Sequence, residues 1–193
     1  MLRTEHKSQA SKNASSFGAD PSKTYTIGGS AGGCLAFALA NRALSDPELS
    51  SGIKGIIAIV PIVVHPDNVP SQYASQYKAW TENAKDVPVL DKESMDIFYE
   101  NLGADPKDKE LFMLLATENH AKFPPTYFAS CGADPLRDDS FIMEKVLKEA
   151  GVKTKHDHYE GQPHYFHIFP QIPESQQFVG NLIGGIEWVK GQM

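Results

Sequence analysis

The pattern G-x-S-x-G at residues 28–32 constrains the fold of this 193-residue chain more than any other feature. It directly follows a β-branched and aromatic run, 24–27, and precedes an apolar stretch from Cys34 to Leu44. This order predicts a strand, a sharp turn at Ser30 and a helix, and both glycines of the pattern are expected to make room for the turn. The turn would expose the serine hydroxyl at a helix N-terminus, where free N–H groups and the helix dipole favour negative charge. A glycine-rich turn that holds an ordinary serine fits the pentapeptide equally well.

Two later segments predict polar side chains at the same edge of a sheet. Residues 125–131 have the pattern of a buried strand that runs into Asp134, and residues 153–159 predict another strand that ends shortly before His164. Open parallel sheets build their sites at the carboxyl ends of the strands, so both side chains are expected beside Ser30. Serine, then acid, then histidine is one of the chain orders in which acyl-transfer triads occur.

Three sequence blocks now show a specific resemblance. They read G-G-S-A-G-G at 28–33, D-P-L-R-D at 134–138 and G-Q-P-H-Y-F at 161–166. The chain resembles the hormone-sensitive-lipase-like branch of the α/β-hydrolases, called α/β-hydrolase fold-3, whose patterns are roughly G-D-S-A-G-G, D-P-L-x-D and G-x-x-H-x-F. The order and intervals fit from about residue 13 onward. Gly29 departs from this pattern, because aspartate is commoner at that position.

The resemblance implies a role for each matching residue. Ser30 is expected to be the nucleophile, Asp134 the orienting acid and His164 the general base. The backbone at Gly29 and Ala31, on either side of the serine, is expected to form the oxyanion site, with the Ala31 N–H as its donor. The implied reaction is hydrolysis of a small-molecule carboxylic ester through an acyl-enzyme, and it requires no cofactor and no metal.

The resemblance also implies a specific part of the family fold. The sequence has candidates for only the last four strands of the family sheet, at Lys23–Ile27, Gly55–Val64, 125–131 and 153–159. We therefore expect an α/β fold consisting of the C-terminal part of an α/β-hydrolase, with about four parallel strands flanked by helices. The helices are expected at Cys34–Leu44, at Asp139–Ala150 and from Pro173 onward.

The domain prediction is a non-family extension at residues 1–12 and a partial α/β-hydrolase domain at 13–193. Residues 65–123 form an insertion within it that would border the substrate pocket, although most of its aromatic side chains are expected to fill a small core instead. The sequence contains no H-G-G-G segment, which in the family supplies most of the oxyanion hole. A fragment, a gene-model error and a reduced homologue all fit this pattern, and activity is expected to be impaired.

Several other polar residues compete for roles. His156 and His158 alternate along a predicted strand, a spacing that can bind a metal but lacks a third ligand. His167 is a rival to His164 outside the family position. Asp138 is expected to brace a loop, and Asp139 to cap the N-terminus of its helix. The remaining histidines, His6, His65 and His120, are expected to be solvated.

Composition excludes several classes of protein. The formal charge of −6 and the pI near 5.6 argue against binding to nucleic acid or to an anionic membrane. The sequence shows no signal-peptide core and no apolar run long enough to span a membrane, which predicts a cytoplasmic protein. Cys34 and Cys131 are expected to be buried hydrophobic side chains rather than redox groups.

Two functions besides ester hydrolysis remain open. An inactive homologue could have a binding or regulatory role, and a lyase or dehydratase could use the same scaffold. The amino-acid sequences of segments such as 18–23 and 161–166 are similar to those of filamentous-fungal family members. This similarity favours a pathway of secondary metabolism or toxin synthesis. The predicted first strand would form an exposed sheet edge, so we expect a homodimer or a complementing N-terminal segment.

Overall fold

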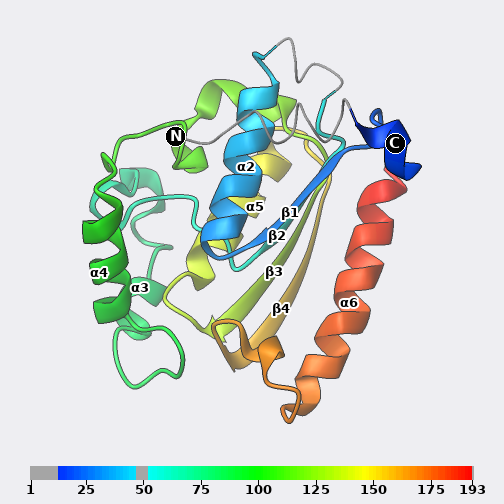
Figure 1. The fold of residues 1–193 in the computed structure, drawn as a ribbon. Coiled ribbons are helices and arrows are strands. Elements are labelled where there is room, and N and C mark those ends of the chain that lie inside the picture. Colours follow the sequence, from blue (N-terminus) through cyan, green and yellow to red (C-terminus); the bar gives the residue numbers. More distant parts are fainter. Residues whose placement is uncertain (1–12, 47–51, 193) are drawn as a thin grey trace.

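A computed structural model describes residues 13–46 and 52–192 of the chain. Its centre is a four-stranded sheet in which the strands follow sequence order, β1-β2-β3-β4, and every neighbouring pair is parallel. The strands span Tyr25–Gly29, Gly55–Ile59, Thr126–Ala133 and Thr154–Pro163. Figure 1 shows them side by side between helices. The predicted α/β class and the number of parallel strands are confirmed.

Helices cover both faces of this sheet. The two helices α2 (Ala31–Ala43) and α5 (Arg137–Glu149) lie on one face, and α6 (Pro173–Lys190) lies on the other (Figure 1). Strand β2 shows the reason, because all five of its residues are buried. Ile56 and Ala58 pack into the α2 and α5 core, whereas alternate residues Ile57 and Ile59 pack into the α6 core. Strand β2 is therefore buried on both faces of the sheet.

One boundary of the predicted strands is wrong. Strand β2 ends at Ile59 rather than Val64, because Val60 has a left-handed φ of 41° and a proline follows it. In α2 the buried face is centred on Phe37, which is fully buried, whereas Leu35 is 44% exposed. The helix begins directly after Ser30, and its buried alanines let it lie close to the sheet.

The segment 65–123 consists of short helices joined by turns. Its α-helices are α3 (Ala79–Glu82) and α4 (Lys92–Leu102), and 3₁₀ turns lie at Pro66–Asn68, Ser71–Tyr73, Met113–Leu115 and Thr117–Lys122. Two further 3₁₀ turns, Ala14–Phe17 and Phe166–Ile168, lie outside this segment.

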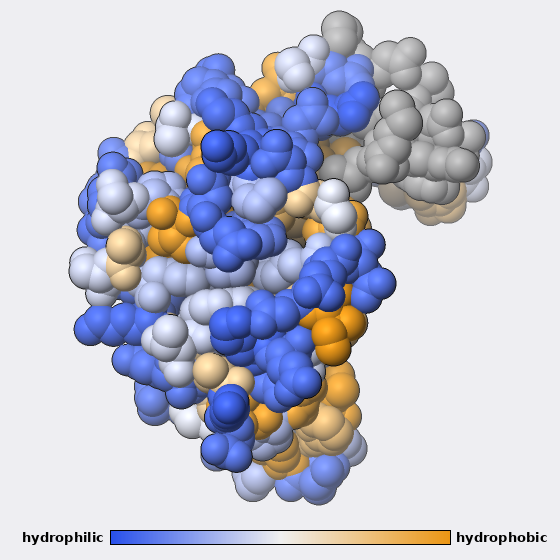
Figure 2. Space-filling model, turned by 90° about the vertical axis from the view of Figure 1, so that its left-hand side faces the viewer, coloured by the Kyte–Doolittle hydropathy of each residue, from blue (hydrophilic) through white to orange (hydrophobic). Residues whose placement is uncertain are grey.

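A small core lies under this segment. Trp80, Tyr99 and Phe112 are buried together with Leu136, as predicted for most aromatics of the insertion, whereas Phe98 is exposed. The face of the molecule over α3 and α4 is mainly hydrophilic, with separate apolar areas (Figure 2). Among the described residues, no helix has both the length and the apolar character that crossing a membrane requires.

Candidate active site

Ser30 lies at a strained turn between β1 and α2. Its φ of 54° and ψ of −123° are rare for a residue with a side chain, and such strain persists where the surrounding structure enforces it. The Ser30 N–H donates to the Ile59 carbonyl at 2.8 Å, so the turn continues the pairing of β1 with β2. Ala31 is the first residue of α2, where backbone N–H groups have no acceptor within the helix. The predicted strand, turn and helix are all present.

The glycines around the serine have unequal roles. A Cβ atom at Gly28 would overlap the Gly32 carbonyl oxygen, and one at Gly33 would come within 2.8 Å of the Pro61 Cβ. These two positions therefore require glycine. A Cβ at Gly32 would meet no atom of the described residues within 4 Å. The expectation that both glycines of the pattern make room for the turn holds for Gly28 and fails for Gly32.

Asp134 and His164 lie together at the carboxyl ends of β3 and β4. The distance from His164 Nδ1 to Asp134 Oδ2 is 2.7 Å, and both side chains are buried. The other carboxylate oxygen, Oδ1, accepts from the Leu136 N–H at 2.8 Å. Because both oxygens of the acid are engaged, its orientation is fixed and the His164 ring is held at Nδ1. Among the described residues, no hydrogen bond joins the Ser30 hydroxyl to His164.

The insertion holds the strand end that bears Asp134. The Asn83 side-chain amide donates to the Gly132 carbonyl at 3.0 Å and to the Asp134 carbonyl at 2.9 Å. Asp138 accepts from the backbone N–H groups of Lys78 and Ala79, each at 2.6 Å. The expectation that Asp138 braces a loop is confirmed. Asn83 was missed, because no local motif marks an amide whose acceptors lie in a distant strand.

Asp139 does not cap a helix, contrary to prediction. It lies inside α5, fully buried, and its Oδ1 accepts from the N–H groups of Val63 and Val64 at 2.9 and 3.3 Å. Burial raises the pKa of this carboxyl to about 8, although the two backbone hydrogen bonds act in the opposite direction. Asp139 therefore holds the segment after β2 against α5. Of these two carboxylates, Asp134 is the one that contacts His164.

His167 does not take the place of His164. Its ring stacks on Phe178 of α6, with centroids 3.9 Å apart and planes 6° from parallel. Burial and the nearby His164 lower the pKa of His167. The histidine that reaches the carboxylate of Asp134 is the one at the predicted position.

The other histidines differ from expectation. His65 and His120 are buried rather than solvated, and His6 lies outside the described residues. The His120 Nε2 lies 2.9 Å from the Met113 carbonyl, and the His65 Nδ1 accepts from the Asp67 N–H at 3.2 Å. Both rings therefore brace the insertion.

His156 and His158 are engaged in hydrogen bonds rather than facing an open metal site. The Ser130 Oγ lies 2.7 Å from His156 Nε2 and 2.8 Å from His158 Nδ1. The remaining ring nitrogens lie 3.1 Å from the carboxylates of Glu144 and Glu160. Among the described residues, no group of three or more His, Cys, Asp or Glu side chains is placed to hold a metal ion.

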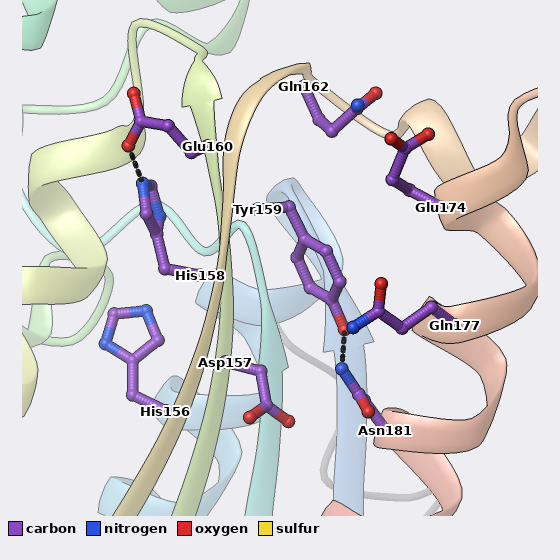
Figure 3. A pocket seen from close by; sticks show the side chains of 9 residues that line it. All are labelled: His156, Asp157, His158, Tyr159, Glu160, Gln162, Glu174, Gln177 and Asn181. Carbon is purple, nitrogen blue, oxygen red and sulfur yellow. Dashed lines mark hydrogen bonds and ion pairs between the residues drawn. The ribbon is translucent and has the colours of Figure 1, made fainter.

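A pocket of about 390 Å³ lies beside this strand, between β4 and α6. Figure 3 shows Tyr159 and Asp157 of β4 facing Asn181 and Gln177 of α6, with Glu174 further along the helix. Its lining does not include Ser30, Asp134 or His164. The pocket is therefore separate from the site that the sequence predicts.

Both cysteines are buried, as expected. Burial raises the pKa of the Cys34 thiol to about 12, and it raises that of Cys131 even further. Since the thiolate is the reactive form, neither side chain is a nucleophile at neutral pH.

Comparison with known proteins identifies the family of this chain. Residues 5–168 match a family model described as alpha/beta hydrolase fold. The chain therefore belongs to the α/β-hydrolase fold-3 family of the esterase and lipase type.

Its relatives include fungal enzymes. The chain is 57% identical over 184 residues to a versiconal hemiacetal acetate esterase of Dothistroma septosporum. The matched residues make up 95% of this chain and 56% of the relative. A versiconal hemiacetal acetate esterase of Aspergillus parasiticus is 36% identical over 166 residues, covering 84% of this chain and 52% of the relative. The solved structure of vibralactone cyclase superposes with a TM-score of 0.91 at 36% identity, covering 97% of this chain and 55% of that one. The chain thus spans about half the length of the relatives it matches.

Proposed function

We propose that this chain is the catalytic part of a serine esterase that cleaves small-molecule carboxylic esters. The observation that carries the proposal is the contact between Asp134 and His164 at the sheet edge where the Ser30 turn lies. Strained serine turns before a helix and buried acid–histidine pairs are the two halves of an acyl-transfer triad. Membership of the esterase-type family supports the same reading.

Each residue has a proposed step. His164 Nε2 takes the proton of Ser30 as the serine oxygen attacks the ester carbonyl carbon. The Ala31 N–H donates to the oxyanion that forms, with Gly29 as the other backbone neighbour of the serine. His164 then gives its proton to the departing alcohol, which leaves an acyl-enzyme. Water attacks the acyl carbon as His164 takes one of its protons, and release of the acid returns a proton to Ser30.

Asp134 acts through the histidine. Its contact with Nδ1 fixes the tautomer in which Nε2 has a free lone pair, and the carboxylate stabilises the imidazolium that forms when the ring takes a proton. No step in this sequence uses a metal ion or an organic cofactor.

The substrate proposed here is an acetate or other short-acyl ester in fungal secondary metabolism. Two relatives from different fungi are named for esterase activity on versiconal hemiacetal acetate, and one is 57% identical to this chain. Hydrolysis of p-nitrophenyl acetate should therefore be faster than that of the octanoate ester.

A fluorophosphonate probe with mass-spectrometric mapping tests the mechanism. We expect covalent labelling at Ser30 that is abolished in Ser30→Ala and strongly reduced in His164→Ala. Ser71→Ala, an exposed serine of the insertion, should label normally. Stoichiometric labelling that persists in Ser30→Ala would refute the assignment.

A second candidate is an inactive homologue with a binding role. It is favoured by one observation, which is that no hydrogen bond joins Ser30 to His164 among the described residues. Catalytic hydrogen bonds are often long without substrate and tighten when it binds, so esterase activity remains the better-supported function. Protein that binds a substrate analogue but neither turns over esters nor reacts with the probe would establish the second candidate.

A further inference from the structure

Gly29 and Tyr165 form a contact that joins the two halves of the proposed triad. Gly29 directly precedes Ser30, and Tyr165 directly follows His164. We propose that Tyr165 is a positioning residue that sets the spacing between nucleophile and base by packing its phenol against Gly29. This inference rests on the proposed esterase function.

The topology creates the need for such a contact. The nucleophile follows β1 and the base follows β4, and these are the two outermost strands of the described sheet. At the usual spacing of neighbouring strands, their axes lie roughly 14 Å apart. His164 therefore approaches Ser30 only if the segment after β4 folds back across the ends of β3 and β2. Whatever holds that segment in place controls the geometry of the triad.

Tyr165 spans this distance from the histidine side. Its backbone adopts a left-handed φ of 58°, which is uncommon for an aromatic residue, at the start of the 3₁₀ turn Phe166–Ile168. Its half-buried ring packs against the core that contains Ile59 and Val60 at the end of β2. The ring centroid lies 5.3 Å from that of His164.

The far end of the phenol meets Gly29. A Cβ atom at position 29 would overlap the Tyr165 hydroxyl oxygen and would lie 2.6 Å from its Cζ and 2.9 Å from its Cε2. The phenol thus occupies the space that any side chain at position 29 would need. This explains in physical terms why the chain has glycine where the family pattern has aspartate.

The other side of the segment is anchored to α6. The Ser175 hydroxyl donates to the carbonyls of Phe166 and Phe169 at 3.3 and 2.9 Å, and His167 stacks on Phe178. The segment is therefore fixed to a helix on one side and reaches β1 through Tyr165 on the other. Shortening Tyr165 should release the β1 side alone.

A double-mutant cycle tests the proposal with Gly29→Ala, Tyr165→Ala and the double variant. Two quantities are measured for each protein: the melting temperature and the rate of fluorophosphonate labelling at Ser30. Gly29→Ala should melt at least about 5 °C lower and label at least about tenfold more slowly. Adding Tyr165→Ala should restore much of the melting temperature, because the Cβ then has room. Gly180→Ala on α6, where a Cβ meets no described atom within 4 Å, is the control; it should label like the parent and should not lower the melting temperature, because alanine favours the helix.

The single tyrosine variants separate positioning from folding. Tyr165→Ala should lower kcat by about tenfold with little change in KM, since small displacements of reacting groups affect the chemical step. Tyr165→Phe retains the ring contacts through Cζ and Cε2 and should rescue kcat. Tyr165→Ala and Tyr165→Phe therefore test the positioning role even if Gly29→Ala does not fold.

The outcomes are distinguishable. Additive effects of the two substitutions on melting temperature would refute the contact itself. Coupled melting temperatures with additive labelling rates would leave the contact structural and refute the positioning role. Absence of labelling at Ser30 in the parent protein would refute the esterase function instead, while the melting cycle would still test the contact.

Discussion

His164 Nδ1 lies 2.7 Å from Asp134 Oδ2, and the second carboxylate oxygen accepts from a backbone N–H. An asparagine at position 134 could keep the second bond but would present an amide to Nδ1 and favour the wrong tautomer. We therefore expect Asp134→Asn to fold and to lose up to about 10⁴-fold in kcat. Asp138→Asn is the matched control, because Asp138 binds the insertion and Arg137 rather than the histidine; it should lower the melting temperature and largely keep kcat. Equal losses of kcat in the two variants would contradict the assigned acid.

The three positions of the proposed triad could be placed at one sheet edge from the sequence because each follows a strand with a local signature. Ser30 sits in a glycine pattern, and Asp134 and His164 each lie within a recognisable block just past an apolar run. A parallel sheet then brings the three strand ends to one edge, whatever the details of packing. The parallel α/β class followed from the same alternation of apolar runs and helical patterns, whereas the order of the strands came from the structure.

The remaining contacts could not be predicted because they join residues far apart in the chain. Asn83 reaches β3 from the insertion, and Tyr165 reaches Gly29 across the sheet, without any local pattern. Asp139 looked like a helix cap because it precedes an apolar helical stretch. The structure instead begins that helix at Arg137 and buries the carboxyl against Val63. The helical pattern of α5 could be recognised in the sequence, but hydrogen bonds to distant residues determine the roles of Asp138 and Asp139.

The lowered pKa of Glu144 predicts that the folded state loses stability in acid. Burial alone would raise its pKa, but hydrogen bonds and charge from His156 and Lys148 outweigh burial and lower the pKa to about 2 from a usual 4.5. A folded-state pKa below the unfolded value stabilises the fold above about pH 4.5, and this contribution disappears as the pH falls towards 2.

Glu144→Gln should therefore melt at a lower temperature than the parent at pH 7, and the difference between the two should shrink steadily as the pH falls from about 4.5 towards 2. Calorimetry from pH 7 to pH 2.5 measures this difference. Glu149→Gln, an exposed glutamate of the same helix, is the control and should melt like the parent throughout. A constant gap between parent and Glu144→Gln at every pH would show that the carboxylate charge is not what stabilises this contact.

The 193-residue chain is expected to self-associate through β1. Among the described residues this strand pairs only with β2, and Ile27 on it is 57% exposed, with Leu35 of α2 exposed at 44%. Unpaired strand edges with apolar neighbours recruit further strands. Light scattering should show dimers or larger species, and Ile27→Lys should reduce them. Ile183→Lys on α6, at a side chain equally exposed, should not. A monomer with a cooperative melt above about 50 °C would contradict the prediction.

The rate of the reaction depends on how many donors face the oxyanion. The donor that we propose in this chain is the Ala31 N–H at the start of α2, and the 193 residues contain no H-G-G-G segment. Removing one such donor typically lowers kcat by about 10²–10³-fold, or roughly 3–4 kcal/mol. The glycine-rich segment normally supplies two donors, and their effects need not add. Ser30 could then attack an ester, but its tetrahedral intermediate would be poorly stabilised.

We therefore expect the isolated chain to hydrolyse p-nitrophenyl acetate at least about a hundredfold more slowly than a relative containing H-G-G-G. Fusing or co-expressing an upstream segment with that sequence should recover most of the rate, because it adds the missing N–H groups. The same segment with its first glycine changed to proline is the matched control, since proline lacks an N–H and should recover less. Turnover by the isolated chain equal to that of such a relative would mean that another group donates to the oxyanion.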